Sequence, residues 1–225
     1  MTAPAAERGA FLRIRPTDLL GRYGAPLGLI ILSIFLAFRS QFFLTPENIA
    51  NISRQSAIIA VLSIGQLIVI LTAGIDLSVG ALLALCVTVL ATMAIKWGIN
   101  PYLAILACLV LGLLLGVTNG LLLTKLHLPH PFISTLGMMN VARGLALIIT
   151  GGFPISNFPD KAVTYIGSQE IAGVPVAFLL VVVLYLLGHL MLNRTTIGRQ
   201  IYAVGGNREA ARLSGVNVDR VLVLV

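Results

Sequence analysis

Long apolar runs, separated by short polar segments, are the feature that most constrains how this chain folds. Crossing the apolar core of a bilayer takes about 20 residues of α-helix, which is close to the length of these runs. Charged residues make up only 10% of the chain, against about 25% in soluble domains, which is too few to cover a water-facing surface. We therefore predict a protein that crosses a membrane about six times. The expected spans are residues 23–38, 57–72, 77–95, 102–124, 132–150 and 174–192.

The fold class follows from the solvent around these runs. Lipid offers the backbone no hydrogen-bond partner, so a spanning segment must be an α-helix or part of a closed barrel. The sequence lacks the alternating pattern of barrel strands. We expect an all-α polytopic membrane protein with one helix broken near residues 74–76 and the start of a seventh helix at 221–225.

Arginines cluster at two places along the chain. Four precede the first apolar run, and five lie between residues 193 and 220. Because cytoplasmic segments of membrane proteins are rich in Lys and Arg, both places are predicted to be cytoplasmic. An even number of crossings must then separate them, and six satisfies this condition. The expected parts are a cytoplasmic N-terminal segment at 1–22, a transmembrane domain at 23–192, a cytoplasmic loop at 193–220 and the start of a truncated further helix at 221–225.

Several classes of function lack their sequence signature. The basic residues behind the net charge of +7 flank apolar runs, so membrane orientation explains them better than nucleic-acid binding does. Cys86 and Cys108 lie inside apolar runs and are interpreted as small buried side chains. The three histidines show no metal-ligand spacing, and no glycine-rich phosphate-binding loop with a lysine is present. We expect no enzyme, no ATP hydrolysis by this chain and no cofactor.

The segment from Gly74 to Asp76 separates two apolar runs with almost no spacer. Asp76 is well suited to cap a helix that begins at Leu77, because its carboxylate can accept hydrogen bonds from the free amides of the first turn. Gly74 permits the unusual backbone that such a break needs. Two interpretations remain open. The segment is either a structural cap or a broken helix beside a solute path, an arrangement that transporters often use at binding sites.

Three glycines, Gly112, Gly116 and Gly120, recur every four residues on one face of the fourth run. Small residues at this spacing let two helices approach closely, so their predicted role is helix packing. Asn119 lies beside this face and is polar at membrane depth. It either hydrogen-bonds a neighbouring helix or lines a cavity, and the sequence favours neither.

Arg143 lies well inside the fifth run, which opens with the segment 131–137. A guanidinium at the centre of a membrane helix costs about 2.5–3.5 kcal/mol on insertion scales. Arg143 is therefore expected to reach water, the interface or a partner. Asp76 is its one obvious acid partner among the apolar runs, and we hypothesise that the two residues pair.

The late basic segment contains a short predicted helix. The glycine pair at 205–206 breaks the chain, and Asn207 is a good N-cap for a helix over 208–213 that Gly215 stops. This helix is rich in small residues and arginine. The segment is either an ordinary solvated loop or a surface that presents itself to a soluble partner.

In this order the features resemble one family, the permease subunits of ribose- and other sugar-type ABC importers. The ordered set of motifs spans nearly the whole chain and is far more specific than any single motif. The matching stretches are 71–80 (LTAGIDLSVG), Thr118-Asn119-Gly120, 131–137 (PFISTLG), Arg143-Gly144, Thr150-Gly151-Gly152 and 202–215.

The resemblance implies half of a channel in the bacterial cytoplasmic (inner) membrane, paired with a second permease copy or a homologue. A periplasmic solute-binding protein would deliver the solute, and a cytoplasmic ABC ATPase subunit would drive the cycle. The short helix would be the coupling helix that docks in a groove of the ATPase. Its expected residues are Asn207, Arg208, Glu209, Ala210, Ala211, Arg212 and Leu213.

By the same resemblance, the solute path would border Asp76 and the segment from Phe132 to Gly137. A monosaccharide or similar polyol suits a path with few charges and with hydroxyl or amide groups. The expected path residues are Asp76, Ser78, Asn119, Phe132, Ser134 and Thr135.

Two other functions compete with this one. A secondary transporter driven by an ion gradient would need internal repeats and membrane acids, and the sequence offers one acid, Asp76, and no convincing repeat. Members of the resembled family are longer and carry further helices, so an inactive truncated permease is the third hypothesis.

Overall fold

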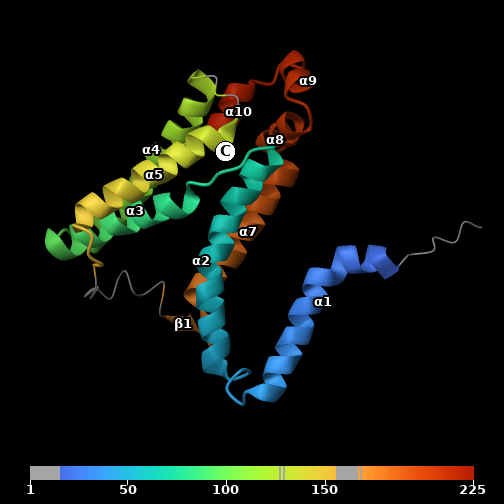
Figure 1. The fold of residues 1–225 in the computed structure, drawn as a ribbon, viewed down its shortest axis with the longest axis vertical. Coiled ribbons are helices and arrows are strands. Elements are labelled where there is room, and N and C mark those ends of the chain that lie inside the picture. The colour runs from blue at the N-terminus through green and yellow to red at the C-terminus, as the bar shows by residue number, and fades with distance from the viewer. Residues whose placement is uncertain (1–15, 127, 129, 156–166, 168) are drawn as a thin grey trace, which may run out of the picture. The chain divides into compact units, whose positions relative to one another are not determined.

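The computed structural model describes residues 16–126, 128, 130–155, 167 and 169–225 of the chain. It forms two compact units, residues 1–49 and residues 50–225. The described residues are mostly helical, with a single two-stranded hairpin among them, which confirms the predicted all-α class (Figure 1). The elements are α1 (Pro16–Arg39), α2 (Pro46–Leu71), α3 (Val79–Ala91), the π-helical η1 (Thr92–Lys96), α4 (Pro101–Lys125), α5 (Pro131–Thr150), β1 (Glu170–Ile171), β2 (Val174–Pro175), α7 (Val176–Arg194), α8 (Thr196–Gly206), α9 (Arg208–Leu213) and α10 (Val218–Leu224).

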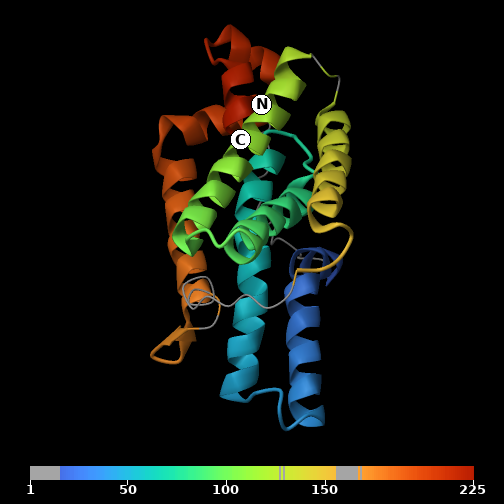
Figure 2. The same cartoon turned by 90° about the vertical axis from the view of Figure 1, so that its left-hand side faces the viewer.

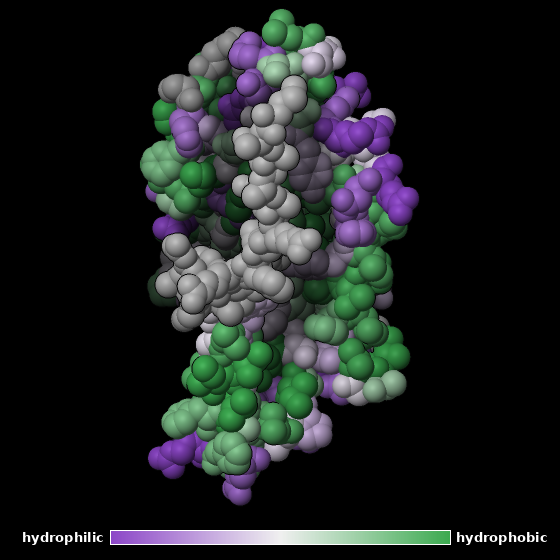
Figure 3. All heavy atoms as spheres, turned by 90° about the vertical axis from the view of Figure 1, so that its right-hand side faces the viewer, coloured by the Kyte–Doolittle hydropathy of each residue, from purple (hydrophilic) through white to green (hydrophobic). Residues whose placement is uncertain are grey.

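Within the described residues, five helical segments are long and apolar enough to cross a membrane. A shorter apolar stretch, Tyr23–Arg39, occupies most of α1 at the place of the first predicted span. Apolar side chains cover wide areas of the molecular face in Figure 3. Such a surface suits lipid or neighbouring helices rather than water, and the chain is a multi-pass membrane protein. The five segments are Pro46–Leu71, Val79–Lys96, Pro101–Lys125, Pro131–Thr150 and Val176–Arg194.

Three of these segments begin with a capping side chain followed by proline. Asn100 accepts a hydrogen bond from the Tyr102 amide at 2.9 Å, and His130 accepts one from the Phe132 amide at 3.2 Å. Thr45 accepts one from the Asn48 amide at 3.3 Å. In each case the next residue is proline, which lacks the amide proton that a first helical turn leaves unpaired.

The start of α2 corrects the sequence prediction. A polar loop was expected before residue 57, but α2 begins at Pro46 and includes Arg54. With 26 residues, α2 is roughly 39 Å long, whereas the hydrocarbon core of a bilayer is about 30 Å thick. The polar first turns therefore form the excess length of a helix rather than a loop.

A short hairpin precedes α7. Strand β1 pairs antiparallel with β2, with Ile171 opposite Val174. The guanidinium of Arg54 on α2 forms an ion pair with the carboxylate of Glu170 on β1, which ties the hairpin to α2. The sequence predicted a polar, turn-rich surface segment at 151–173, and residues 156–166 and 168 of it lie outside the described residues.

Two helix groups make up the second unit. Helices α3, α4 and α5 pack together, with Ala81, Leu85 and Ala142 in their shared core. Helix α7 lies along α2, where the Tyr185 hydroxyl donates to the Ala60 carbonyl at 3.4 Å. Figures 1 and 2 show α8, α9 and α10 gathered at the end of α2 where Leu71 lies.

A compact cluster of apolar side chains holds α8, α9 and α10 against the end of α2, and we call it the end cluster. It brings together the ends of α2 and α7 with α8, α9 and α10. Its buried members are Leu192, Ile201, Val204, Ala211, Val218 and Val221, against which Ile68 and Leu71 of α2 pack. The segment after residue 193, predicted as a basic loop with one short helix, is therefore mostly helical and packed.

Candidate solute cavity at the break between α2 and α3

Helix α2 stops in a Schellman-type turn. The Gly74 amide donates to the Val69 carbonyl at 3.1 Å, and the Ala73 amide donates to the Ile70 carbonyl at 2.9 Å. This pairing requires a left-handed residue just past the helix, normally glycine. Here it is Ala73, with φ of 57°. The prediction that Gly74 supplies the unusual backbone was therefore wrong by one residue.

Gly74 has a different task in this turn. A Cβ atom on Gly74 would lie 3.0 Å from Cγ1 of Val69 and 3.2 Å from its carbonyl oxygen. The absence of a side chain lets the chain fold back closely on the last turn of α2. Gly74 thus allows the turn to contact the last turn of α2, whereas Ala73 adopts the strained left-handed conformation.

The strain at Ala73 gives a first prediction. Replacing Ala73 with glycine should stabilise the protein by about 1 kcal/mol, because a left-handed alanine costs roughly 1–2 kcal/mol. The measurement is the midpoint of thermal unfolding in detergent. Ala203→Gly is the matched control, since Ala203 lies exposed inside α8 and the same change there should destabilise by about 1 kcal/mol. A lower midpoint for Ala73→Gly would contradict the left-handed assignment.

Asp76 organises the chain between the two helices. Its Oδ1 accepts hydrogen bonds from the Ser78 amide at 2.7 Å and from the Ser78 hydroxyl at 2.6 Å. Helix α3 begins at Val79 rather than at the predicted Leu77, and Ser78 is its N-cap residue. Ser78 is completely buried. Asp76 therefore holds the entry to α3 through Ser78.

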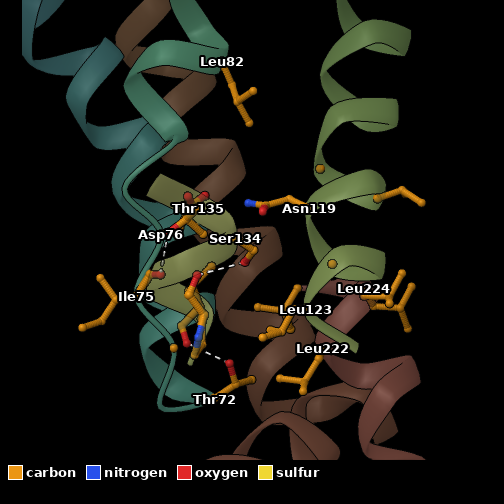
Figure 4. A pocket seen from close by; sticks show the side chains of 18 of the residues that line it. Thr72, Ile75, Asp76, Leu82, Asn119, Leu123, Ser134, Thr135, Leu222 and Leu224 are labelled. Carbon is orange, nitrogen blue, oxygen red and sulfur yellow. Dashed lines mark hydrogen bonds between the residues drawn. The ribbon is translucent and has the colours of Figure 1, made fainter. Parts of the chain in front are cut away.

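Three helices hold this break from outside. Nε2 of Gln66 on α2 donates to the Asp76 carbonyl at 3.1 Å. The Thr135 hydroxyl on α5 lies 3.4 Å from the Ile75 carbonyl, and Nδ2 of Asn119 on α4 lies 3.4 Å from the Ser78 hydroxyl. Figure 4 shows Asp76, Thr135 and Asn119 approaching one another from these separate elements.

A cavity of about 240 Å³ opens at the break. This is somewhat below the roughly 300–1,000 Å³ typical of pockets for drug-sized ligands, so it suits a small solute. Asp76 is the one ionisable residue among the described residues that line it. The polar lining comes from Thr72, Asp76, Asn119, Ser134 and Thr135, and the apolar lining includes Leu82, Leu123 and Leu222.

Asn119 presents an unused acceptor here. Its Oδ1 atom is buried and has no hydrogen-bond partner within the described part of the chain. Buried polar atoms are nearly always paired in native proteins, so such an atom beside a cavity suggests a missing donor. Of the two alternatives left open by the sequence, both hold, since Asn119 contacts a neighbouring element and also lines the cavity.

The structure brings most of the predicted path residues together. Asp76, Asn119, Ser134 and Thr135 line the cavity. Ser78 lies buried behind Asp76. Phe132 is 43% exposed and is not among the lining residues. Whether these residues contact a solute remains a prediction.

The three glycines of α4 have separate surroundings. A Cβ on Gly120 would lie 2.9 Å from Cα of Val223, so α4 and α10 touch backbone to backbone there. A Cβ on Gly112 would meet Sγ of Cys86 on α3 at 3.6 Å. Gly116 lines the cavity. The predicted role in close helix packing therefore applies most clearly to Gly120, where α4 meets α10.

The hypothesised pair of Asp76 and Arg143 is not present, although both residues are described. Oδ1 of Asp76 is engaged by Ser78. Arg143 lies eight residues beyond Thr135 on α5, or roughly 12 Å of helix rise from the break. Its side chain is exposed, in agreement with the expectation that it reaches the surroundings of the helix.

The predicted short helix is confirmed as α9. Oδ1 of Asn207 accepts from the Ala210 amide at 3.0 Å, and Gly215 has a left-handed φ of 85°. The helix has two sides. Arg208 is half-buried and Ala211 is buried, whereas the remaining side chains point outward. The outward residues are Asn207, Glu209, Ala210, Arg212 and Leu213.

Sequence reasoning missed two polar contributors to the break, Gln66 and Thr72. Gln66 donates to the Asp76 carbonyl, and Thr72 is 2% exposed and lines the cavity. Both are polar residues inside the second apolar run. Polar side chains at membrane depth are functional candidates by default, so this signal was present in the sequence.

Fold and site together define a polytopic α-helical membrane protein with a polar cavity beside a broken helix. Residues 48–225 match the family model described as "Branched-chain amino acid transport system / permease component". The chain belongs to this family of permease components, and its homologues are named as permeases rather than enzymes.

The chain is similar to several curated sugar permeases. It is 41% identical over 95% of its length to the ribose import permease protein RbsC of Bacillus subtilis and 37% identical over 88% to that of Escherichia coli K12. It is 36% identical over 87% to the D-allose transport system permease protein AlsC of E. coli K12. It spans 66%, 62% and 60% of the lengths of these relatives. No solved structure matches the chain.

Proposed function

We propose that this chain is a membrane-spanning permease subunit of an ATP-driven importer of a monosaccharide or similar polyol. The single observation that carries the proposal is the cavity at the break, which offers hydroxyl, amide and carboxylate groups and no cation among its described lining residues. Such groups exchange hydrogen bonds with sugar hydroxyls. The relatives named as ribose and D-allose permeases support this substrate class.

The partners follow from the same proposal. An ABC ATPase subunit docks on the outward side of α9, at Glu209, Ala210 and Leu213. A periplasmic solute-binding protein delivers the sugar, and a second permease subunit completes the path. The protein lies in the bacterial cytoplasmic membrane with its N-terminus in the cytoplasm, as the arginine clusters predict. Leu213, which is 88% exposed, offers the apolar anchor that a docking surface needs.

Copurification tests the docking proposal. The tagged protein, expressed with its cognate ATPase subunit, should capture that subunit from solubilised membranes. Glu209→Lys combined with Ala210→Trp should lower capture by about tenfold or more, because a reversed charge and a bulky side chain disrupt a complementary surface at a cost above about 1.4 kcal/mol.

Asp219→Lys is the control for charge reversal. Asp219 is also exposed but lies on α10, outside the docking helix. Capture should stay at the wild-type level in this variant. Equal capture by the α9 double variant and the wild-type protein would sink the docking assignment, and uptake of the sugar without any ATPase subunit would overturn the ATP-driven mechanism.

A further inference from the structure

The side chain of Arg208 points toward the rest of the protein, whereas those of the other charged residues of α9 point outward. Glu209 and Arg212 are exposed and pair with each other at 2.9 Å. Arg208 is half-buried, and its Nη2 donates to the Thr72 carbonyl at 3.3 Å. Thr72 is the first residue after α2, so the guanidinium lies at the negative end of that helix, where a cation is stabilised.

A second contact fixes the same place. A Cβ on Gly205 would lie 1.8 Å from the Leu71 carbonyl oxygen, so α8 and the end of α2 touch backbone to backbone. Ile201 and Val204 of α8 are each 1% exposed and belong to the end cluster, against which Leu71 packs. The corner between α8 and α9 is therefore packed directly on residues 71–72.

The chain beyond Thr72 leads straight into the cavity. Thr72 and Asp76 both line it, and only three residues lie between them in the sequence. The intervening turn is held by Gln66 and Thr135 through the carbonyls of Asp76 and Ile75. Because these hydrogen bonds restrain the turn, a displacement of Thr72 is passed on to Asp76 rather than absorbed by rotations of the backbone between them.

We infer that Arg208 is a positioning residue that couples α9 to the cavity. Its hydrogen bond to Thr72 makes a movement of α9 displace the break at 72–76, and thereby the polar lining around Asp76. The inference rests on the proposed function, because it takes the ATPase subunit as the agent that moves α9. It assigns Arg208 to the inner side of α9, away from the docking surface.

The experiment separates docking from transmission. A reporter cysteine replaces Leu123, which lines the cavity on α4, in a protein whose Cys86 and Cys108 are changed to alanine. Copurified permease–ATPase complexes are labelled with a small thiol reagent, with and without ATP and vanadate. In complexes with Arg208, trapping the nucleotide should change the labelling rate several-fold.

Arg208→Gln should capture the ATPase subunit as the wild-type protein does and should lose the nucleotide-dependent change in labelling. Arg220→Gln is the matched control, because Arg220 is an exposed arginine on α10, outside the docking helix, and its captured complexes should keep the change. A wild-type protein that captures no ATPase subunit would refute the proposed function itself.

Three results would overturn the inference while the proposed function stands. In the first, Arg208→Gln keeps the full labelling change. In the second, Arg208→Gln loses capture, which would make Arg208 a docking or folding residue. In the third, the Leu123 reporter shows no nucleotide response in wild-type complexes, or both arginine variants lose it alike.

Discussion

Replacing Gly205 with alanine is expected to destabilise the protein by about 3 kcal/mol or more. The new Cβ would lie 1.8 Å from the Leu71 carbonyl oxygen and 2.9 Å from its carbonyl carbon. Overpacking usually costs about 1–3 kcal/mol where side chains can yield, but here both partners are backbone. Helix α8 must therefore lift from α2, which also separates the end cluster from Ile68 and Leu71 of α2 that pack against it.

The neighbouring glycine supplies the control. A Cβ on Gly206 would meet nothing within 4 Å, so Gly206→Ala should shift stability by less than about 1 kcal/mol. The measurement is the midpoint of thermal unfolding in detergent, with ATPase capture as a second observable. If Gly205→Ala unfolds at the same temperature as Gly206→Ala, the backbone contact between α8 and α2 is wrong.

Much of the fold could be predicted from local patterns in the sequence. The apolar runs predicted the spans because lipid imposes helices of a fixed length. Asn207 and Gly215 predicted the limits of α9, since capping depends on residues next to each other in sequence. The same local rule failed at Gly74, because the choice between Ala73 and Gly74 depends on how closely the turn returns to Val69.

Contacts between distant segments account for what sequence reasoning missed. The polar groups at Gln66 and Thr72 were visible, but nothing local joins them to Asp76 or to Arg208, which is 136 residues from Thr72. The pair of Asp76 and Arg143 was inferred from charge alone and ignored position along α5. Opposite charges indicate partners only when the fold brings them within reach, and here Ser78 was the nearer donor.

Asp76 offers a way to separate the two interpretations that its sequence left open. Asp76→Ala should destabilise the protein by about 3 kcal/mol, because the Ser78 amide and hydroxyl lose their acceptor in a site where Ser78 is 0% exposed. Each buried polar group left unpaired costs about 1–3 kcal/mol. A structural cap and a path residue both predict this loss, so alanine alone does not distinguish them.

Asp76→Asn does distinguish them. The asparagine side chain keeps an oxygen acceptor for Ser78 and the shape of the turn, so the unfolding midpoint should stay near the wild-type value. The cavity loses its carboxylate, and a hydrogen bond from a solute hydroxyl to that charged group is worth about 1.5–3 kcal/mol. Solute uptake by the assembled importer should therefore fall by roughly 10- to 100-fold. Asp219→Asn is the matched control, since Asp219 is exposed on α10 and does not line the cavity, and this variant should retain uptake. Wild-type uptake by Asp76→Asn, at an unchanged midpoint, would make Asp76 a structural cap and remove it from the path, because the charge would then have no partner in transport.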